Sequence, residues 1–118
     1  MILASTETLP GVEIREVVGL VRGNTIRARH LGKDIAAAFK NMAGGEITDY
    51  TKMMGESREQ ALDRMVEEAE LLGADAIVGI RFTTSSVMQG AAEILVYGTA
   101  VTINSTGYPQ AVGRASEE

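Results

Sequence analysis

The sequence predicts an α+β domain in which one sheet packs against helices. β-branched residues concentrate between positions 12 and 29, and two further strand-like runs occupy 76–82 and 92–103. Between them, an apolar stripe at three- and four-residue spacing predicts a long helix. A chain of 118 residues fits one domain with one core. We place this domain at residues 1–103 and a polar C-terminal tail at 104–118.

The N-terminal part is expected to be strand. Residues 2–5 form a short extended segment, which the turn signal Pro10–Gly11 closes. Residues 12–29 are expected to form one long strand or two. The apolar alternation changes phase between Glu16 and Val18, and Gly23–Asn24 tolerates positive φ. We therefore expect a bulge or tight turn there.

Two helical segments follow. Residues 34–42 place apolar side chains on one face of a short helix, which Gly44–Gly45 ends. A longer helix is predicted over 47–72 as one continuous element, with Gly55 as a weak point within it. Gly73 supplies the left-handed residue that ends this helix.

The C-terminal strands carry apolar residues on both faces. Residues 76–82 alternate, and the run Ala76, Val78, Ile80 and Phe82 is expected on one face. Residues 83–91 are rich in Ser, Thr and Gly and predict a loop. In the strand at 92–103, alternate residues are apolar on one side from Ala92 to Ala100, and Leu95, Tyr97, Val101 and Ile103 make the other side apolar too.

An antiparallel sheet covered by helices on one side should have a polar outer face. We therefore expect another copy of the chain to cover the second face, packing sheet on sheet or adding strands at the edges. The alternative is that the N-terminal strand and the tail fold over that face.

Composition excludes several classes of function. The chain has no cysteine, which removes disulfides, thiolate metal sites, iron–sulfur clusters and thiol nucleophiles. A formal net charge of −5 argues against nucleic acid as a partner. No apolar run reaches membrane-spanning length, and no signal-peptide pattern begins the sequence, so we expect a cytoplasmic protein without a membrane partner.

Three stretches together resemble the bacterial and archaeal YbjQ-like family over about residues 1–103: GLVRGNTIRARHLGKDIAAAFKNMAGGEITDY, REQALDRMVEEAELLGADAIVGIRF and LVYGTAVTI. The resemblance implies a dodecin-like β-α-β-β fold with a mainly antiparallel sheet on helices. It also implies a homo-oligomeric ring, reported in that family as a pentamer. The family label reads "putative heavy-metal-binding", and no established enzymatic activity comes with the resemblance.

Candidate site residues form no catalytic or metal-ligating motif, so we predict no enzyme activity, no metal site and no cofactor. Soft metals need thiolates or several imidazoles, whereas this chain offers only His30 and six methionines. A basic cluster could instead bind an anion; it comprises Arg15, Arg22, Arg27, Arg29 and Lys33. The residues predicted to bind a ligand are Arg27, Arg29, His30, Tyr50 and Arg81. The glycines predicted to be structural are Gly23, Gly44, Gly45, Gly73, Gly79 and Gly98.

The leading hypothesis is a non-enzymatic homo-oligomer, most simply a pentameric ring, that binds a small ligand or ion at its subunit interfaces. Two alternatives remain open: a heavy-metal-binding protein, and an enzyme whose active site is shared between subunits.

Overall fold

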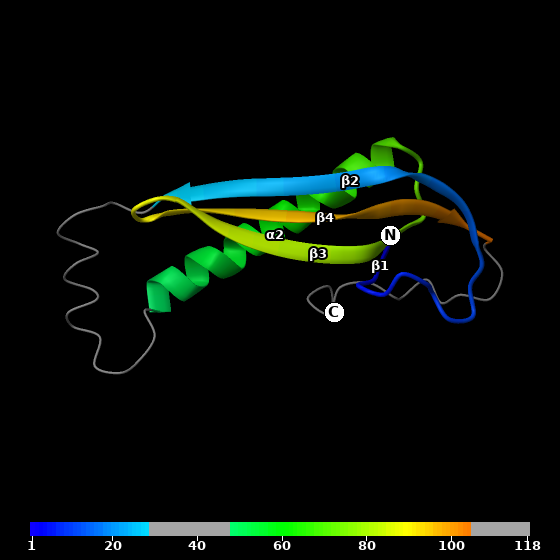
Figure 1. Ribbon diagram of the computed structural model, residues 1–118, viewed down its shortest axis with the longest axis horizontal. Coiled ribbons are helices and arrows are strands. Elements are labelled where there is room, and N and C mark those ends of the chain that lie inside the picture. Colours follow the sequence, from blue (N-terminus) through cyan, green and yellow to red (C-terminus); the bar gives the residue numbers. More distant parts are fainter. Residues whose placement is uncertain (29–47, 105–118) are drawn as a thin grey trace.

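A computed structural model describes residues 1–28 and 48–104 of the chain, and Figure 1 shows a sheet with a helix crossing it. The elements are β1 (Ile2–Leu3), β2 (Ile14–Ala28), α2 (Thr48–Leu71), β3 (Ala76–Met88) and β4 (Ala91–Ile103). The sheet has four strands in the order β1-β3-β4-β2; β1 pairs with β3 in parallel, and the other pairs are antiparallel. This confirms the α+β class. The short helix predicted at 34–42, with Gly44 and Gly45, and the tail from residue 105 lie outside the described residues.

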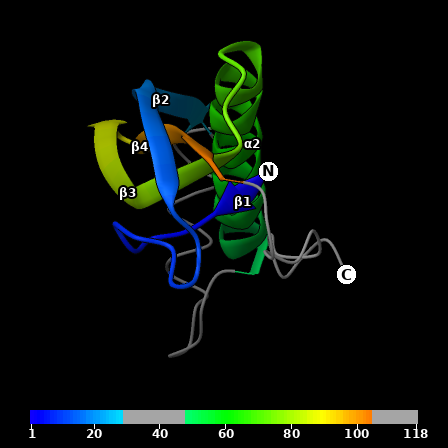
Figure 2. The same cartoon turned by 90° about the vertical axis from the view of Figure 1, so that its right-hand side faces the viewer.

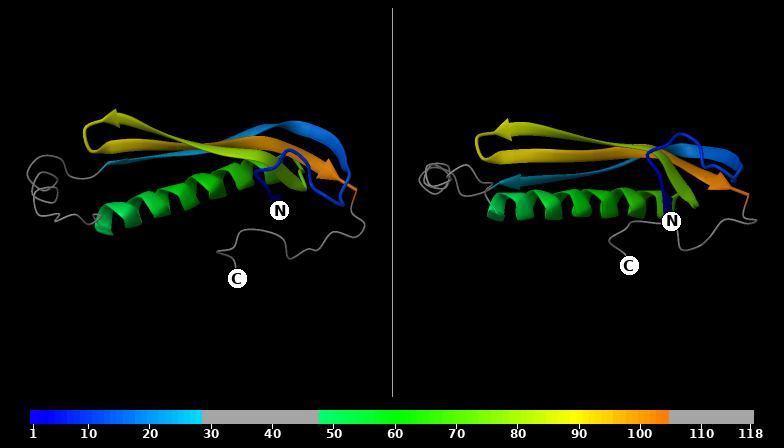
Figure 3. Two further views of the ribbon diagram at one scale, coloured as in Figure 1. Left: turned by 60° about the horizontal axis from the view of Figure 1, so that its bottom comes forward. Right: turned by 90° about the horizontal axis from the view of Figure 1, so that it is seen from below.

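Helix α2 covers one face of the sheet, over β2 and β4 (Figures 2 and 3). The helix is continuous through Gly55, as predicted. The main core lies between these layers and contains Val21, Ala61, Leu62, Met65, Ala69, Ile77, Ile80, Ile94, Val96 and Ala100. A buried hydroxyl pair adds a polar contact, because Thr25 Oγ1 lies 3.1 Å from the carbonyl oxygen of Ser57 and 3.2 Å from its Oγ.

The helix ends where the sequence predicts. Gly73 has a φ of +75°, its N–H donates to the carbonyl of Glu70 (3.0 Å), and the Ala74 N–H donates to that of Ala69 (3.1 Å). These two bonds form the Schellman arrangement, which satisfies carbonyl groups that a helix end leaves without partners.

The bulge or tight turn predicted at Gly23–Asn24 is wrong, because β2 continues through these residues as one strand in regular register with β4. Irregularities in its pairing with β4 fall earlier, between Ile14 and Glu16 and between Val17 and Gly19, where the apolar phase changes. Gly23 serves a different purpose: a Cβ there would collide with the carbonyl oxygen of Ala61 and lie 2.6 Å from the Met65 nitrogen. The glycine therefore lets α2 approach β2 closely.

The predicted faces and length of β3 also need correction. Gly79 has a φ of +63° and lies in a bulge between Val78 and Arg81, so Val78 and Ile80 belong to different core clusters instead of sharing a face. The predicted loop at 83–91 is mostly strand, and only the turn at Gln89–Gly90 separates β3 from β4. Thr is β-branched and favours strands, and pairing with β4 gives this segment its backbone partners.

The N-terminal segment, residues 1–13, which we call the arm, covers one end of the second sheet face. Leu9 is buried there with Ala76, Val78 and Val101, and Ile2, Ala4, Val12, Ile14 and Ile103 pack around them. The alternative in which the N-terminal strand folds over the second face thus holds for this end of the sheet. The described part of the chain extends 55 × 25 × 19 Å.

Candidate functional site

The sheet surface that faces away from α2, beyond the arm, is the first candidate site, and we call it the open face. Its members follow from the register, because they alternate with residues buried against α2 and lie opposite residues of the same face, with Val17 opposite Val101 and Leu20 opposite Thr99. They are Val17, Leu20, Arg22, Asn24 and Ile26 of β2, Glu93, Leu95 and Tyr97 of β4, and Arg81, Thr83 and Ser85 of β3. Figure 3 shows α2 on one side of the sheet and the arm at one end of the other side.

Large apolar side chains of the open face are in contact with water. Val17, Leu20 and Ile26 are 69%, 67% and 60% exposed, and Tyr97 is 39% exposed. Full burial of one such aliphatic side chain is worth about 1.5–3 kcal/mol. A row of them on one face is a feature of interaction surfaces, because monomers rarely leave contiguous apolar patches uncovered.

The outer edge of β3 is the second candidate site. The arm pairs with its first part: Ala4 N–H donates to the Ile77 carbonyl (2.9 Å), and Gly79 N–H donates to the Thr6 carbonyl (2.8 Å). The Arg81 guanidinium holds the arm through the Ser5 carbonyl (2.7 Å) and also contacts the Ile80 carbonyl (2.9 Å). From Phe82 to Met88, no strand within residues 1–28 or 48–104 pairs with this side of β3. We call residues 82–88 the free edge.

The opposite edge of the sheet differs, because side chains of α2 bond to the backbone of β2. The Arg22 N–H donates to Oε1 of Glu68 at 3.1 Å. Nη1 of Arg64 donates to the carbonyl oxygen of Asn24 at 2.7 Å. Polar helix side chains thus occupy the middle of this edge, whereas the free edge of β3 has no such cover among the described residues.

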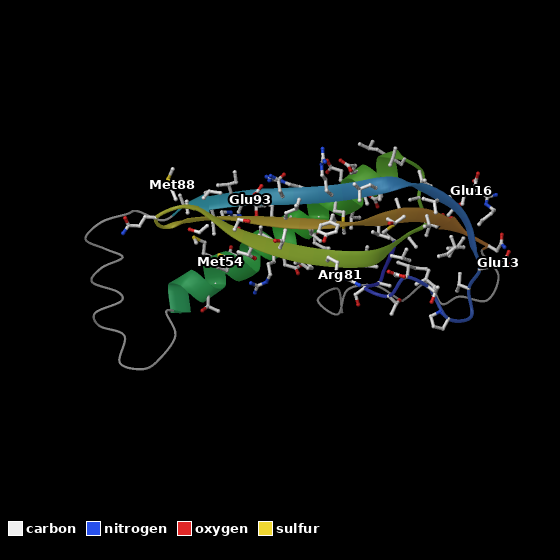
Figure 4. All side chains as sticks on the ribbon, in the orientation of Figure 1. Glu13, Glu16, Met54, Arg81, Met88 and Glu93 are labelled. Atoms are coloured by element: carbon white, nitrogen blue, oxygen red, sulfur yellow. The ribbon has the colours of Figure 1, made fainter. Side chains whose placement is uncertain are left out.

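The residues predicted to bind a ligand do not converge within the described part of one chain. Arg27 lies on the helix side of β2, where Nη2 donates to Oε1 of Gln60 at 2.7 Å. Arg81 lies on the other face of the sheet, across from Tyr97, and its guanidinium is bound to the arm (Figure 4). Tyr50 belongs to the first turn of α2, and Arg29 and His30 lie outside the described residues.

Two of the predicted structural glycines stand at close approaches. Gly23 allows α2 to pack closely against β2, as described above. At Gly98, a Cβ would lie 2.7 Å from Cγ2 of Ile77 and 3.1 Å from the Val78 carbonyl oxygen. The absence of a side chain at Gly98 therefore leaves room on β4 for the Ile77 side chain of β3, beside the Gly79 bulge.

The described residues provide no suitable cluster of ligands for a heavy-metal ion. Across residues 1–28 and 48–104, no group of three or more His, Cys, Asp or Glu side chains is arranged to hold a metal ion. The sequence contains no cysteine and one histidine. Thiolate and imidazole are the donors that soft metals prefer, so this donor set does not fit such an ion. In the same residues, no helix is long and apolar enough to cross a bilayer.

Comparison with known proteins identifies close relatives. A family model for the YbjQ family, described as "Putative heavy-metal-binding", matches residues 1–104. A UPF0145 protein of Thermosipho melanesiensis is 61% identical over 101 residues, covering 86% of this chain and 94% of the relative. One from the archaeon Methanosarcina acetivorans is 58% identical over 103 residues, covering 87% of this chain and 97% of the relative.

A solved structure shows a similar fold. A protein of unknown function from Pediococcus pentosaceus, assigned to the DUF74 family, superposes with a TM-score of 0.64 at 18% identity. The match covers 88% of this chain and 98% of that chain. At this identity the likeness concerns the fold alone.

Sequence reasoning missed much of both candidate sites. The two-sided pattern of β4 pointed to the open face, but the contribution of Leu20 and Ile26 was hidden by the bend expected at Gly23–Asn24. The free edge was missed because residues 83–91 were expected to form a loop. The β-branched Thr83 and Thr84 before Gly90 were the available signal.

Proposed function

The chain belongs to the YbjQ family, and from that premise we propose that it is a non-enzymatic assembly protein. Its copies associate into a homo-oligomer that covers the open face, and the subunit interfaces hold a small ligand or ion. Five subunits in a ring is the arrangement that the sequence resemblance favours. The family description names no catalytic activity, and the two relatives described above are each named UPF0145 protein.

The exposed apolar side chains on the open face of β2 are the observation that carries this proposal. Val17, Leu20 and Ile26 are each at least 60% exposed on the sheet face that α2 does not cover. Within residues 1–28 and 48–104, the arm covers only one end of this face, around Val78 and Val101. A second copy brings apolar surface of its own, so its docking removes both surfaces from water at once.

The extended shape supports the same conclusion. A compact chain of about 100 residues has a radius of gyration of roughly 13 Å, whereas the described part of this chain has a radius of gyration of 17.6 Å. The long β3–β4 hairpin accounts for much of the extension (Figure 1). A sheet that a helix covers on one face only gains burial when its other face packs against a neighbour.

Two matched substitutions test the proposal. Leu20→Glu places a charge on the open face, whereas Leu71→Glu places the same charge on a residue that is 84% exposed at the end of α2. We expect the wild-type protein to be oligomeric at micromolar concentration by native mass spectrometry and light scattering. Leu20→Glu should lower the mean mass, and Leu71→Glu should leave it unchanged. A folded wild-type monomer at these concentrations would contradict the proposal.

Heavy-metal binding is a second candidate, favoured by the family description alone. The donors present do not fit a soft metal, and we derive no chemistry through one. Elemental analysis of protein purified without chelators decides the matter. Stoichiometric zinc, copper or nickel retained through dialysis would promote this candidate, and a metal-free protein that ignores added metal would remove it.

A further inference from the structure

The middle of the open face carries a second inference, which rests on the proposed function because it names the class of ion that this face holds. We propose that Arg22, Tyr97 and Arg81 form a binding site for an oxyanion, that is, a carboxylate or phosphate group. The three residues come from adjacent strands, since Arg22 of β2 pairs with Tyr97 of β4, and Tyr97 pairs with Arg81 of β3. We call these three residues the arginine row.

The register places two guanidinium groups on either side of one phenol. Neighbouring strands of a sheet lie about 4.8 Å apart, so Arg22 and Arg81 are separated by roughly 10 Å across β4. Both arginines are exposed, and Tyr97 is 39% exposed, so the three side chains are open to a ligand. Guanidinium N–H groups and a phenol O–H are donors that suit the oxygen atoms of an oxyanion.

Contacts with the arm and with its own strand hold the Arg81 side chain in place. Nη1 of Arg81 donates to the carbonyl oxygens of Ser5 (2.7 Å) and Ile80 (2.9 Å). These two bonds leave the N–H groups of Nε and Nη2 for a ligand. A side chain that is fixed before binding loses less conformational entropy when the ligand binds. The two carbonyl contacts therefore prepare this guanidinium for an oxyanion.

The positive charge of the arginine row is not balanced by a carboxylate beside it on the open face. Glu93 is the only carboxylate among the described members of this face, and its Oε2 accepts from Nδ2 of Asn24 at 3.2 Å. Glu93 lies nearer to the β3–β4 turn than Arg81 does (Figure 4). Its separation from Tyr97 along β4 is roughly 13 Å, beyond the Debye length of about 8 Å at physiological ionic strength. The attraction of Glu93 for the row is therefore largely screened.

A second copy seated on the open face would make the site stronger. Covering the arginine row removes water from two positive charges, and a buried charge without a partner is strongly unfavourable. An oxyanion between the guanidinium groups supplies that partner, and its hydrogen bonds strengthen where water is excluded. Oxyanion binding and the association of copies should therefore favour each other.

The site differs from the basic cluster that the sequence suggests. Arg15 forms an ion pair with Glu16 at 3.6 Å. Arg27 lies on the helix side of β2. Among the described members of that cluster, Arg22 is the one that lies on the open face, and Arg81 joins it from a strand distant in the chain.

Isothermal titration calorimetry of the full chain tests the site with two probes, sodium phosphate and sodium succinate. Each probe is titrated at pH 7 and compared with sodium chloride at the same ionic strength. We expect saturable binding of at least one probe and none of chloride. Binding of both probes would identify the charge that they share as the feature recognised, and binding of one alone would identify its class. The absence of saturable binding with either probe would overturn the proposal.

Matched substitutions locate the binding. Arg22→Gln removes one guanidinium from the arginine row, whereas Arg15→Gln removes the same charge at a position roughly 20 Å away along β2. We expect Arg22→Gln to weaken binding at least about tenfold, as for loss of a charged donor, and Arg15→Gln to weaken it less than about twofold. Tyr97→Phe removes only a hydroxyl and should weaken binding about threefold. Equal affinities for Arg22→Gln and Arg15→Gln would overturn the site.

Two controls complete the test. The Arg22 side chain is exposed, so Arg22→Gln should keep the wild-type midpoint of urea denaturation; if it does not fold, Tyr97→Phe with wild-type affinity overturns the site. Native mass spectrometry in the same buffers separates this site from the assembly. A wild-type monomer whose phosphate or succinate binding depends on Arg22 would remove the assembly and support the site. An oligomer that binds neither probe would remove the site alone.

Discussion

The closest approach between α2 and β2 offers the sharpest test of the fold, through the substitution Gly23→Ala. An added Cβ would collide with the Ala61 carbonyl oxygen and lie 2.6 Å from the Met65 nitrogen and 3.0 Å from Cβ of Arg64. Two of these neighbours are helix backbone, which cannot rotate away as a side chain can. The helix must therefore move off the strand.

The loss of stability can be estimated from the contacts that this movement of the helix weakens. Overpacking by one methyl group typically costs about 1–3 kcal/mol, and a gap of 0.5–1 Å forfeits roughly a quarter to a half of each dispersion contact across it. Met65, fully buried beneath the strand, and the Thr25–Ser57 hydroxyl pair both lie in this interface. We expect Gly23→Ala to lower the free energy of unfolding by about 3 kcal/mol, at the upper end of that range.

Gly55→Ala is the matched control, since it makes the same chemical change in α2. Its nearest neighbour would be Nη2 of Arg58 at 3.8 Å, an ordinary contact. Alanine in a helix interior is favoured over glycine by about 0.8–1.0 kcal/mol, so this variant should be more stable than the wild type. The two Gly→Ala changes thus have opposite signs.

Urea denaturation followed by circular dichroism measures both variants. Subunit concentration is held fixed, because association adds to apparent stability. With a slope of about 1–3 kcal/mol per molar urea, Gly23→Ala should lower the midpoint by about 1–3 M. A Gly23→Ala protein with the wild-type midpoint would refute the close approach.

Two further predictions concern single positions. Met65→Ala leaves a cavity at a fully buried position and should lower the free energy of unfolding, measured by urea denaturation, by about 2–5 kcal/mol. Leu71→Ala, at an exposed site, should change it by less than about 0.5 kcal/mol, and similar losses for the two variants would contradict the assigned core. Gly90→Ala places a side chain at a turn position with φ of +76° and should lower the free energy of unfolding by about 1–2 kcal/mol, whereas Gly90→Asn should lower it less. Thermal unfolding measures both variants, and melting temperatures equal to that of the wild type would contradict this turn.

Local sequence patterns were sufficient to predict several elements of the fold. The apolar stripe predicted α2 to within one residue at each end, and Gly73 predicted its end, because both depend on neighbours a few residues apart. The two-sided apolar pattern of β4 was also correct, since its alternation is regular throughout. The phase change near Val17 likewise corresponds to a real irregularity in β2.

Other features depended on partners distant in the chain. Gly23 looked like a turn residue, and only the position of Ala61 on the facing helix shows that it clears space for α2. The Ser/Thr-rich residues after Phe82 looked like a loop, and only pairing with β4 makes them strand. The bulge at Gly79 places Val78 and Ile80 on opposite faces of the sheet, and the alternation in the sequence does not reveal this bulge.

The sequence by itself determined that this chain forms an α+β domain with apolar residues on both faces of its last strand, because the apolar periodicity depends only on the order of the residues. The tertiary structure decided which of those residues the arm buries and which stay on the open face. It also decided that one sheet edge is bonded to α2 while the other ends in the free edge. Burial and strand pairing are properties of segments that meet in space, and here such segments can be far apart in the chain: Glu13 and Asn104, which are hydrogen-bonded, are 91 positions apart.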